Sequence, residues 1–582
     1  MNLKRKLIAG NLISILLLSE SIFAQPSPPL GGFLPGSAQS QQVGRALQSQ
    51  QPKPAQAAPN APTQPGEAKL EIPEALRKIK FKLNGINLKG NTVYSTAQLS
   101  QFYKPLLHKT ISVADLFVVM QKITNYYRNN GYILSRAVLS EQKVTNGIVQ
   151  IDVIEGYVGK VTVIGTPYGA KRLVSKMGNK LTIKRPLQLT DMEKYLFILN
   201  EIPGTSVKAN LAASKEKIPA LGSAQVNLLT ENHPLMGYFS YDNYGTRYIG
   251  PQQMTANIGF NSFLMSGDTG QFTFTKTPKG RELTYLDGNY NLPLDYSGSR
   301  LLLGATHTDT HPLFVLAPIK IHGLTDNYYM LATFPLIRSR TSTLNLRLGF
   351  YYLDSPTTFL NDVLLYVDHL RSLDLGITYV FSDNWNGSNQ ILLDFKQGLP
   401  IWGYSSDNNP KTAQTSRPGG CANYSKIALN MSRLQAIKGP FSLYGLVMGQ
   451  YGFEPLLSSE QFAFGGPVIG RGYDPSEILG DRGAALSLEL RFTKAIGRFG
   501  IDNLQFYGFY DGGITWDYLF IGNVPIKQSA TSAGFGMRFY MTKYVSGNIM
   551  WTKPLTRKVA AEALIGRGGE TRVFFSVIAN LG

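Results

Sequence analysis

The C-terminal part of the chain, from about residue 233 to residue 582, alternates apolar and polar residues. In residues 344–352, leucine and aromatic side chains occupy one face of an extended chain, while Asn345, Arg347 and Gly349 lie on the other. In residues 271–275, two phenylalanines alternate with glutamine and threonine. Because successive side chains of a strand point to opposite faces, this period of two predicts a long series of β-strands.

A closed barrel that spans a membrane is the fold that this pattern favours. Only a closed barrel satisfies the backbone hydrogen bonds of every strand in lipid, with apolar side chains outside and polar ones inside. The segment 233–582 has room for about sixteen strands at roughly 22 residues per strand and loop. A soluble β-sandwich would alternate too, but the 31 Tyr, 30 Phe and 58 Gly suit aromatic belts and many turns. We expect a mainly β protein with a transmembrane antiparallel barrel.

The N-terminus carries the pattern of an export signal. Lys4-Arg5-Lys6 is a basic start, Leu7–Leu18 is mostly apolar, and Ala24 is a plausible last residue before cleavage. An apolar part of about 12 residues is too short for a membrane anchor, which needs about 20. We expect residues 1–24 to be a signal peptide.

Residues 25–70 are rich in Pro, Gln, Ala and Ser. Such a segment cannot bury enough surface to offset the entropy lost on ordering, so we expect a linker. Within it, Ser37–Gln51 predicts either a short polar helix or a flexible leader.

Residues 71–157 change to a mixed α and β pattern. Ser112, with Asp115 three residues later, predicts a capped helix that begins there, and Gly131 predicts its left-handed end. The expected elements, in a β-α-α-β-β order, are strand Lys80–Ile86, helix Thr96–Tyr103, the helix after Ser112, and strands Tyr132–Leu139 and Ile148–Ile154.

Residues 158–232 repeat this order more weakly. Pro203-Gly204 separates the second helix from the strands that follow. The expected elements are strand Lys160–Ile164, helices Ala170–Met177 and Thr190–Leu199, and strands Ser206–Ala212 and Ser223–Leu229.

Prolines mark the ends of several barrel strands. Proline is tolerated at a strand end but not in the middle of a ladder. We therefore expect tight periplasmic turns at residues 291–294, 334–338 and 553–556, and an outward loop in the glycine- and asparagine-rich stretch Tyr404–Asn423.

The stretch 465–474 is the most informative part of the chain. It holds several glycines and one arginine, Arg471, and is followed by residues 478–483 and the alternating run 485–492. A glycine-rich loop that runs straight into a strand predicts a loop folded back against the barrel wall.

This constellation resembles the inward-folded loop of the two-partner secretion outer-membrane transporters (TpsB type, the ShlB/FhaC/HecB haemolysin secretion/activation family). Residues 71–157, with Tyr126–Tyr132 and Ile154-Glu155-Gly156, resemble a POTRA domain of the ShlB type, and residues 158–232 resemble a second one. Tyr241–Gly245, followed by Gly250-Pro251, resembles the first barrel strand and loop of these transporters. One position departs from the family, because a β-branched residue usually stands where this chain has Gly470.

The resemblance implies a transporter in the bacterial outer membrane, with its POTRA domains in the periplasm. It would recognise and secrete a large β-rich exoprotein, haemolysin- or adhesin-like, through the barrel of residues 233–582 without ATP. The POTRA domains would bind the partner's N-terminal secretion domain, outer-membrane lipid would surround the barrel, and the transporter would be a monomer. The resemblance also implies that the helix of the linker sits in the pore.

An ion pair is the chemistry that the resemblance implies. Asp511 would meet Arg471, whose planar fork of donors suits a carboxylate, and the surrounding glycines would let the loop pass close to the wall. The alternative is that Asp511 belongs to a turn and Arg471 is solvated. The implied residues are the pore-loop motif Gly470, Arg471, Gly472 and Tyr473, the barrel-wall motif Phe509, Asp511 and Gly513, and the loop supports Gly480, Asp481 and Gly483.

Other chemistry finds little support. The net charge of +19 is spread along the chain with no recognition motif, so we expect no nucleic-acid partner. Cys421 is the single cysteine and cannot form an internal disulfide or a thiolate cluster. On an extended strand, His307, Asp309 and His311 share one face, a possible metal trio; a polar strand end at the barrel rim is the interpretation that we favour. We expect no cofactor, no metal and no enzyme activity.

Two other functions remain open. A barrel-assembly insertase of the same superfamily would usually carry more POTRA domains and a lateral seam between its first and last strands. A diffusion porin with soluble periplasmic modules would pass small solutes without a dedicated protein partner.

Overall fold

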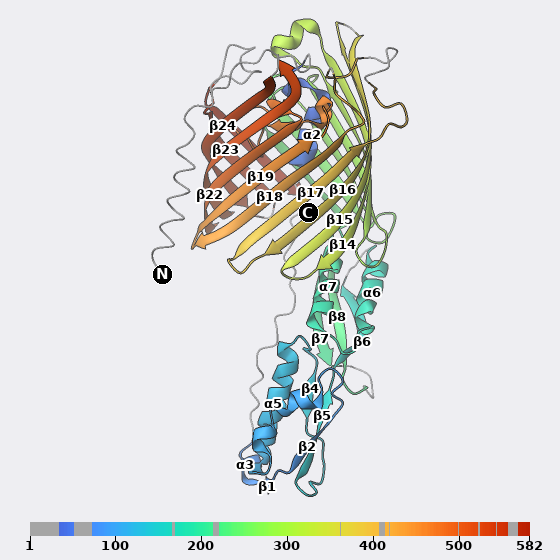
Figure 1. The fold of residues 1–582 in the computed structure, drawn as a ribbon, viewed down its shortest axis with the longest axis vertical. Coiled ribbons are helices and arrows are strands. Elements are labelled where there is room, and N and C mark those ends of the chain that lie inside the picture. The colour runs from blue at the N-terminus through green and yellow to red at the C-terminus, as the bar shows by residue number, and fades with distance from the viewer. Residues whose placement is uncertain are drawn as a thin grey trace.

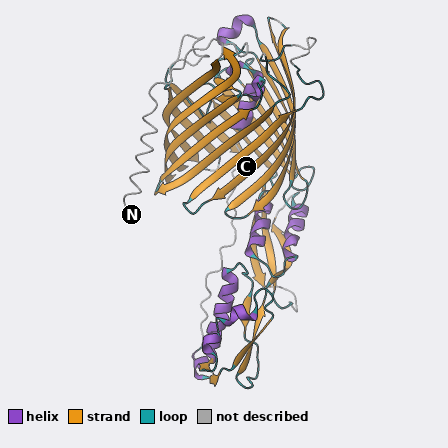
Figure 2. Ribbon diagram, viewed as in Figure 1, coloured by secondary structure: helices purple, strands orange, loops and turns teal. Residues whose placement is uncertain are grey.

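The computed structural model describes residues 34–51, 73–165, 169–213, 220–360, 362–406, 414–417, 419–498, 500–521, 524–542, 544–556 and 569–581. A closed β-barrel fills one end of the molecule, and two small α/β units extend from it in a row (Figure 1). Most of the helical structure belongs to these two units and to one helix inside the barrel (Figure 2). The expected signal peptide, residues 1–24, lies outside the described residues.

Sixteen antiparallel strands close the barrel, which confirms the predicted fold. Strand β26 pairs with β9 to complete the ring. Because the small units precede β9, this strand runs away from them and each later strand reverses direction. The strands are β9 (Leu235–Asp242), β10 (Gln253–Asn261), β11 (Thr269–Lys276), β12 (Leu283–Pro293), β13 (Arg300–Thr310), β14 (His322–Arg338), β15 (Ser342–Phe359), β16 (Val363–Ser382), β17 (Gly387–Gly398), β18 (Ser425–Lys438), β19 (Phe441–Gly452), β22 (Arg482–Arg498), β23 (Ile501–Ile521), β24 (Val524–Met541), β25 (Val545–Pro554) and β26 (Arg572–Leu581).

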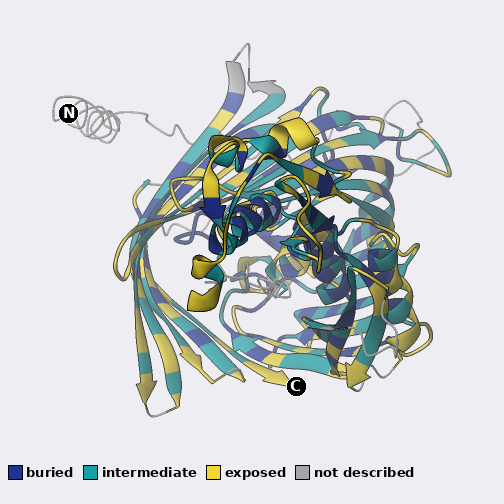
Figure 3. Cartoon of the chain, turned by 90° about the horizontal axis from the view of Figure 1, so that it is seen from below, coloured by how far each residue is buried: buried dark blue, intermediate teal, exposed yellow. Residues whose placement is uncertain are grey.

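The alternation of apolar and polar residues gives the barrel wall an apolar outer face and a polar inner face. Phe272 is 56% exposed on the outside, whereas Thr273 beside it is buried. On β15, Leu348 is exposed, and its neighbour Arg347 donates to Asp374 at 2.8 Å. Seen from below, buried segments gather inside the ring of strands (Figure 3). Among the described residues, no helix is both long and apolar enough to cross a membrane.

The first small unit packs one long helix, α5, against a three-stranded sheet of order β2-β5-β4. The predicted cap is confirmed: the Ser112 hydroxyl accepts from the Asp115 N–H at 3.3 Å, and the Asp115 carboxylate accepts from the Ser112 N–H at 2.7 Å. Gly131 has a φ of +91°, as expected for a left-handed helix end. The elements are α3 (Glu74–Lys78), β1 (Lys80–Lys82), β2 (Gly85–Lys89), α4 (Thr96–Ser100), η2 (Lys104–Leu106), β3 (Thr110–Ser112), α5 (Val113–Asn129), β4 (Arg136–Val138) and β5 (Ile148–Ile154).

Glu155 joins three parts of this first unit. Its Oε1 accepts hydrogen bonds from the Tyr127 hydroxyl at 2.7 Å and from the N–H groups of Thr92 and Val93 at 2.7 and 2.8 Å. Tyr127 is fully buried, and burial, followed by the hydrogen bond to Glu155, raises the pKa of its hydroxyl. One carboxylate therefore links α5 to the turn that precedes α4.

The second small unit repeats the order and rests against the barrel. Its sheet has the order β6-β8-β7. Arg338 pairs with Glu201 at 2.7 Å, Arg340 pairs with Glu193 at 2.8 Å, and these arginines lie at the turn between β14 and β15. The elements are β6 (Tyr157–Gly165), α6 (Lys171–Asn179), η3 (Lys180–Thr182), α7 (Leu189–Asn200), β7 (Thr205–Ala213) and β8 (Ser223–Asn232).

Three local expectations were wrong. Lys80–Ile86 forms two strands because Leu83 hydrogen-bonds with Lys109 and His108, after which β2 pairs with β5. The strand expected over Tyr132–Leu139 shrinks to the three residues of β4. Residues 553–556 lie at the far end of the barrel, because β25 runs away from the small units. Proline marks a strand end but does not say which end.

Helix α2 (Ser40–Gln50), preceded by η1 (Gly36–Ala38), lies inside the barrel. The Ser40 hydroxyl is 2.7 Å from the Thr325 hydroxyl of β14, and a Cβ on Gly44 would meet the Thr308 hydroxyl of β13 at 2.6 Å. The helix is mostly polar, so the polar lumen is the surface that it can pack against. The structure therefore has the polar helix rather than the flexible leader.

Candidate functional site in the barrel lumen

The chain between β19 and β22 turns back into the barrel. It contains η5 (Ser458–Glu460) and the short strands β20 (Phe462–Phe464) and β21 (Ile478–Gly480), which pair with each other. The tip of this loop packs an apolar cluster of Phe464, Ile469 and Tyr473 against side chains of β19 and β22. The Tyr473 hydroxyl donates to the Thr531 carbonyl of β24 at 2.9 Å. The loop is thus held against the wall along much of its length.

Arg471 lies at the tip of the loop and is 4% exposed. Its Nε and Nη2 donate to the two carboxylate oxygens of Asp511 at 3.0 and 2.8 Å, and its backbone N–H donates to Asp511 Oδ2 at 2.9 Å. The guanidinium carbon also lies 3.6 Å from the ring centre of Phe509. The structure brings together Arg471, Asp511 and Phe509, with Asp511 on strand β23 rather than in a turn.

Sequence reasoning missed a second acidic partner of this arginine. Arg471 Nη1 donates to Glu489 Oε2 at 2.6 Å, and Nη2 donates to the Ser487 hydroxyl at 2.9 Å. Glu489 also accepts from Arg491 at 2.6 Å and from Arg538 at 2.7 Å. Ser487 pairs directly with Asp511 across β22 and β23. The period of two in the run 485–492 places Ser487 and Glu489 on the same face of the strand. This alternation is the sequence signal that could have indicated Glu489 as a lumen-facing partner.

Two glycines of the loop have steric reasons to be glycine. Gly470 has a φ of +75°, and a Cβ there would lie 2.7 Å from the Phe464 ring. A Cβ on Gly472 would lie 2.8 Å from the Ser532 Cβ and 3.0 Å from the Pro554 nitrogen. A β-branched residue at 470 would therefore clash in this loop conformation, in which glycine fits.

The expected loop supports surround a second buried ion pair. Asp481 is fully buried and accepts from Arg417 Nη2 at 2.9 Å, from the Leu456 N–H at 2.8 Å and from the Tyr518 N–H at 2.7 Å. Arg417 comes from the loop between β17 and β18. A Cβ would contact Thr515 at Gly480, Phe462 at Gly483 and Phe464 at Gly513, all within 2.7 Å.

Asp474 connects the loop to both sides of the barrel closure. Its carboxylate accepts from Arg247, which follows the first barrel strand, at 2.6 Å. It also accepts from Arg572, the first residue of the last strand, at 2.7 Å. Below it, β9 and β26 pair over only six residues, from Asp242 to Gly237. One loop carboxylate therefore holds the two strands that close the ring.

Helix α2 and the loop contact each other directly. Arg45 Nη1 donates to the Ser459 carbonyl at 2.8 Å and Nη2 donates to the Gln461 carbonyl at 3.1 Å. The Ser476 hydroxyl donates to Gln42 Oε1 at 3.2 Å. The lumen beside Arg45 has a polar cavity of about 270 Å³, lined by charged side chains that include Arg347, Lys396 and Glu460. The helix and the loop thus occupy the lumen as one hydrogen-bonded body.

Comparison with protein families relates this arrangement to known sequences. Residues 222–539 match the model of the haemolysin secretion/activation protein ShlB/FhaC/HecB, and residues 81–156 match that of the ShlB-type POTRA domain. The chain is 24% identical to the outer membrane transporter CdiB of Dickeya dadantii, over 78% of this chain and 79% of the relative. It is 22% identical to the heme/hemopexin transporter protein HuxB of Haemophilus influenzae, over 83% of this chain and 85% of the relative.

Solved structures show the same fold. CdiB from Escherichia coli superposes with a TM-score of 0.69 at 19% identity, covering 93% of this chain and 96% of that chain. CdiB from Acinetobacter baumannii superposes with a TM-score of 0.59 at 17% identity, with the same coverage. The barrel with its two preceding units is common to all three chains.

Proposed function

We propose, from the chain's membership of the haemolysin secretion/activation ShlB/FhaC/HecB family, that it secretes one dedicated exoprotein by the two-partner route. The chain is an outer-membrane transporter, and its POTRA domains lie in the periplasm. The exoprotein is large, β-rich and haemolysin- or adhesin-like, and it crosses the barrel without ATP. The observation that carries the proposal is a sixteen-stranded barrel whose lumen holds a buried loop and a polar helix.

Passage of a polypeptide requires the lumen to change. Besides the packing of Val43 and Leu47, helix α2 is held there by hydrogen bonds to hydroxyl and carbonyl groups, such as those of Thr325 and Ser459. Each such bond contributes a net of about 0.5–1.5 kcal/mol, because water replaces it when it breaks. Arg471 is held by two carboxylates instead. In our proposal the helix leaves the lumen during transport, while the Arg471 loop stays anchored to the wall.

The POTRA domains supply the binding surface for the exoprotein. The sheet of the first one, residues 71–157, has the order β2-β5-β4, so within the described residues β2 and β4 each have one edge without a paired strand. An extended segment of the partner's secretion domain would add to such an edge by main-chain hydrogen bonds. We propose residues 158–232 as the second POTRA domain and residues 233–582 as the barrel; the transporter works as a monomer.

We assign roles to the loop residues in this proposal. Arg471 and Asp511 anchor the loop, Phe509 supports the guanidinium, and Tyr473 fixes the loop tip to β24. Gly470, Gly472 and Gly513 allow the close approach, and Asp481, between Gly480 and Gly483, ties the loop base to Arg417.

Deletion of the transporter gene tests the function. We expect one large protein to disappear from the culture medium and its precursor to remain in the periplasm, while uptake of small solutes is unchanged. A general loss of outer-membrane barrels would instead indicate an assembly insertase. Slower uptake of small solutes with secretion intact would indicate a diffusion porin.

Deletion of residues 71–157 tests the role of the first POTRA domain. We expect the barrel still to insert, because the two regions have separate cores, and binding of the exoprotein to be lost. Binding retained by the barrel alone would contradict the assignment.

A further inference from the structure

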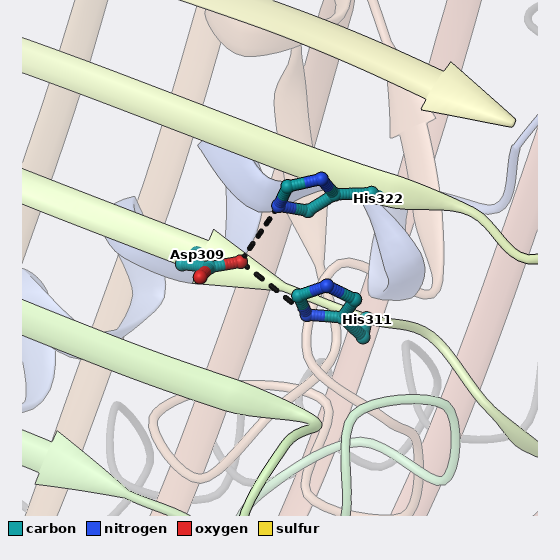
Figure 4. Close-up of side chains that lie close together, drawn as sticks. All are labelled: Asp309, His311 and His322. Atoms are coloured by element: carbon teal, nitrogen blue, oxygen red, sulfur yellow. Dashed lines mark hydrogen bonds and ion pairs between the residues drawn. The ribbon is translucent and has the colours of Figure 1, made fainter. Parts of the chain in front are cut away.

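Three side chains with metal-binding atoms converge at the far end of the β13–β14 hairpin, outside the lumen. His322 Nε2 lies 3.1 Å from Asp309 Oδ1, and His311 Nδ1 lies 3.4 Å from the same oxygen. The two imidazole rings stack at 4.3 Å, and one donor atom from each of the three residues lies within 4.8 Å of the others. Figure 4 shows the two rings one above the other on the same side of Asp309, with a dashed line from its carboxylate to each ring.

The set differs from the trio that strand periodicity suggested. His307 shares the face of Asp309 but pairs with Asp326 at 2.7 Å, on the next strand. His322, the first residue of β14, takes its place because the hairpin register sets Thr310 opposite Gly323. The cluster therefore joins both ends of the loop 311–321, which no pattern along one strand could show.

The face on which the cluster lies follows from its neighbours. Thr308 and Thr310 are buried and lie toward α2 in the lumen, so Asp309 between them faces outward. Asp309 and His322 keep 32% and 30% of their side-chain surface, and His311 keeps 43%. Because β13 runs away from the POTRA domains, this end of the hairpin faces the cell exterior. An ion can therefore reach the cluster directly from the medium.

We propose that Asp309, His311 and His322 form a binding site for a divalent transition-metal ion of the Zn²⁺ class. Two imidazole nitrogens and one carboxylate oxygen are a ligand set that such ions prefer. Ligand atoms about 2.0–2.1 Å from a tetrahedral zinc lie about 3.3 Å from one another, which matches the spacings of 3.1 and 3.4 Å. The open fourth position would hold water.

One further observation agrees with coordination at His311. Within the described part of the chain, its Nδ1 has no hydrogen-bond partner, and Asp309 Oδ1 lies 3.4 Å away. An imidazole nitrogen that makes no hydrogen bond can serve as a metal ligand.

The ion would brace the loop that covers the lumen helix. The Leu313 N–H donates to the Tyr248 carbonyl at 2.7 Å, and the rings of Phe314 and Tyr248 lie 6.3 Å apart. Tyr248 in turn packs with Val43 and Leu47 of α2. A metal that ties His311 to His322 fixes both ends of this loop above the helix.

The test is titration of the full-length transporter in detergent with ZnCl₂ by isothermal calorimetry. The protein must carry an affinity tag other than polyhistidine. We expect one saturable site per chain, weakened by about 10-fold or more in His311→Ala, in His322→Ala and in Asp309→Asn, since even partners of metal ligands contribute about that much. His307→Ala is the matched control, because it removes another histidine of this hairpin that pairs with an aspartate, Asp326, and it should bind zinc as the parent does.

Two controls keep the outcome clear. Heat-modifiable migration in gels reports whether each variant barrel is folded. Cobalt(II) absorption in the visible range reports coordination by a signal that unfolded protein lacks. Saturable binding that persists in the three cluster variants, or the absence of binding in the folded parent, would overturn the proposal.

Discussion

Replacement of Arg471 by alanine should release the loop from the barrel wall. The change removes four side-chain hydrogen bonds, two to Asp511, one to Glu489 and one to Ser487. Asp511 is fully buried and keeps only the backbone N–H of residue 471 among these partners. Glu489 keeps two arginines, Arg491 and Arg538, so most of the penalty falls on Asp511.

The magnitude follows from the burial of the pair. Removing one partner of a buried ion pair costs about 3–5 kcal/mol. Since each 1.4 kcal/mol is a factor of ten, the detached loop should become about 100- to 4,000-fold more populated. Asp511→Ala should have a smaller effect, because Arg471 retains Glu489 and Ser487. The double variant should be no worse than Arg471→Ala, since both changes break one interaction.

Thiol labelling can measure this population. In a Cys421→Ser background, Ser476→Cys places the only thiol at a loop position that is 5% exposed. Its reaction with a maleimide in isolated outer membranes should accelerate in proportion to the detached fraction, and secretion of the exoprotein should fall. Arg498→Ala, an exposed arginine at the periplasmic end of β22, is the matched control. Parent-like labelling in Arg471→Ala would refute the reasoning, as would full secretion by both single variants.

The remaining predictions concern the other parts of the chain. Glu155→Ala should lower the free energy of unfolding of residues 73–232 by about 1–3 kcal/mol, because the buried Tyr127 hydroxyl loses its acceptor; urea denaturation followed by circular dichroism measures this. Removal of residues 34–51 should raise the single-channel conductance in planar bilayers, since α2 occupies the lumen; an unchanged conductance would mean that the helix does not block it. N-terminal sequencing of the mature protein should begin near Gln25; a start at Met1 would contradict the export signal.

The barrel could be predicted from the sequence because every strand has one face toward lipid, which requires apolar side chains, and one face toward the lumen, which accepts polar ones. Residues 485–490, which alternate in sequence, also alternate between buried and exposed side chains, and the length of residues 233–582 leaves room for the sixteen strands that form. The capping pair Ser112 and Asp115 acts within one helical turn, so the local sequence could predict it. The division of Lys80–Ile86 into two strands could not be predicted in this way, because it depends on the distant residues Lys109 and His108.

The site was only partly predictable for the same reason. Motif resemblance indicated the pair of Arg471 and Asp511. That Glu489 also accepts a hydrogen bond from Arg471 depends on the register of β22 against β23. Many polar residues face the lumen, and the sequence does not show which of them lie at the same level along the barrel axis and can contact one another. The ion pairs of Arg417 and Asp474 join loops that are far apart in the chain. The proposed metal site of Asp309, His311 and His322 depends on the register between β13 and β14.

The position of Asp474 has a mechanical consequence for the whole ring. The first and last strands are joined by six residue pairs, whereas β9 and β10 share eight. Arg247 and Arg572 stand on either side of this short junction, and Asp474 is the counter-charge that they share. The loop carboxylate therefore lies between two cations next to this short ladder and offsets the repulsion that would act between them. A loop that stays anchored during transport therefore also helps to keep the first and last strands of the barrel together.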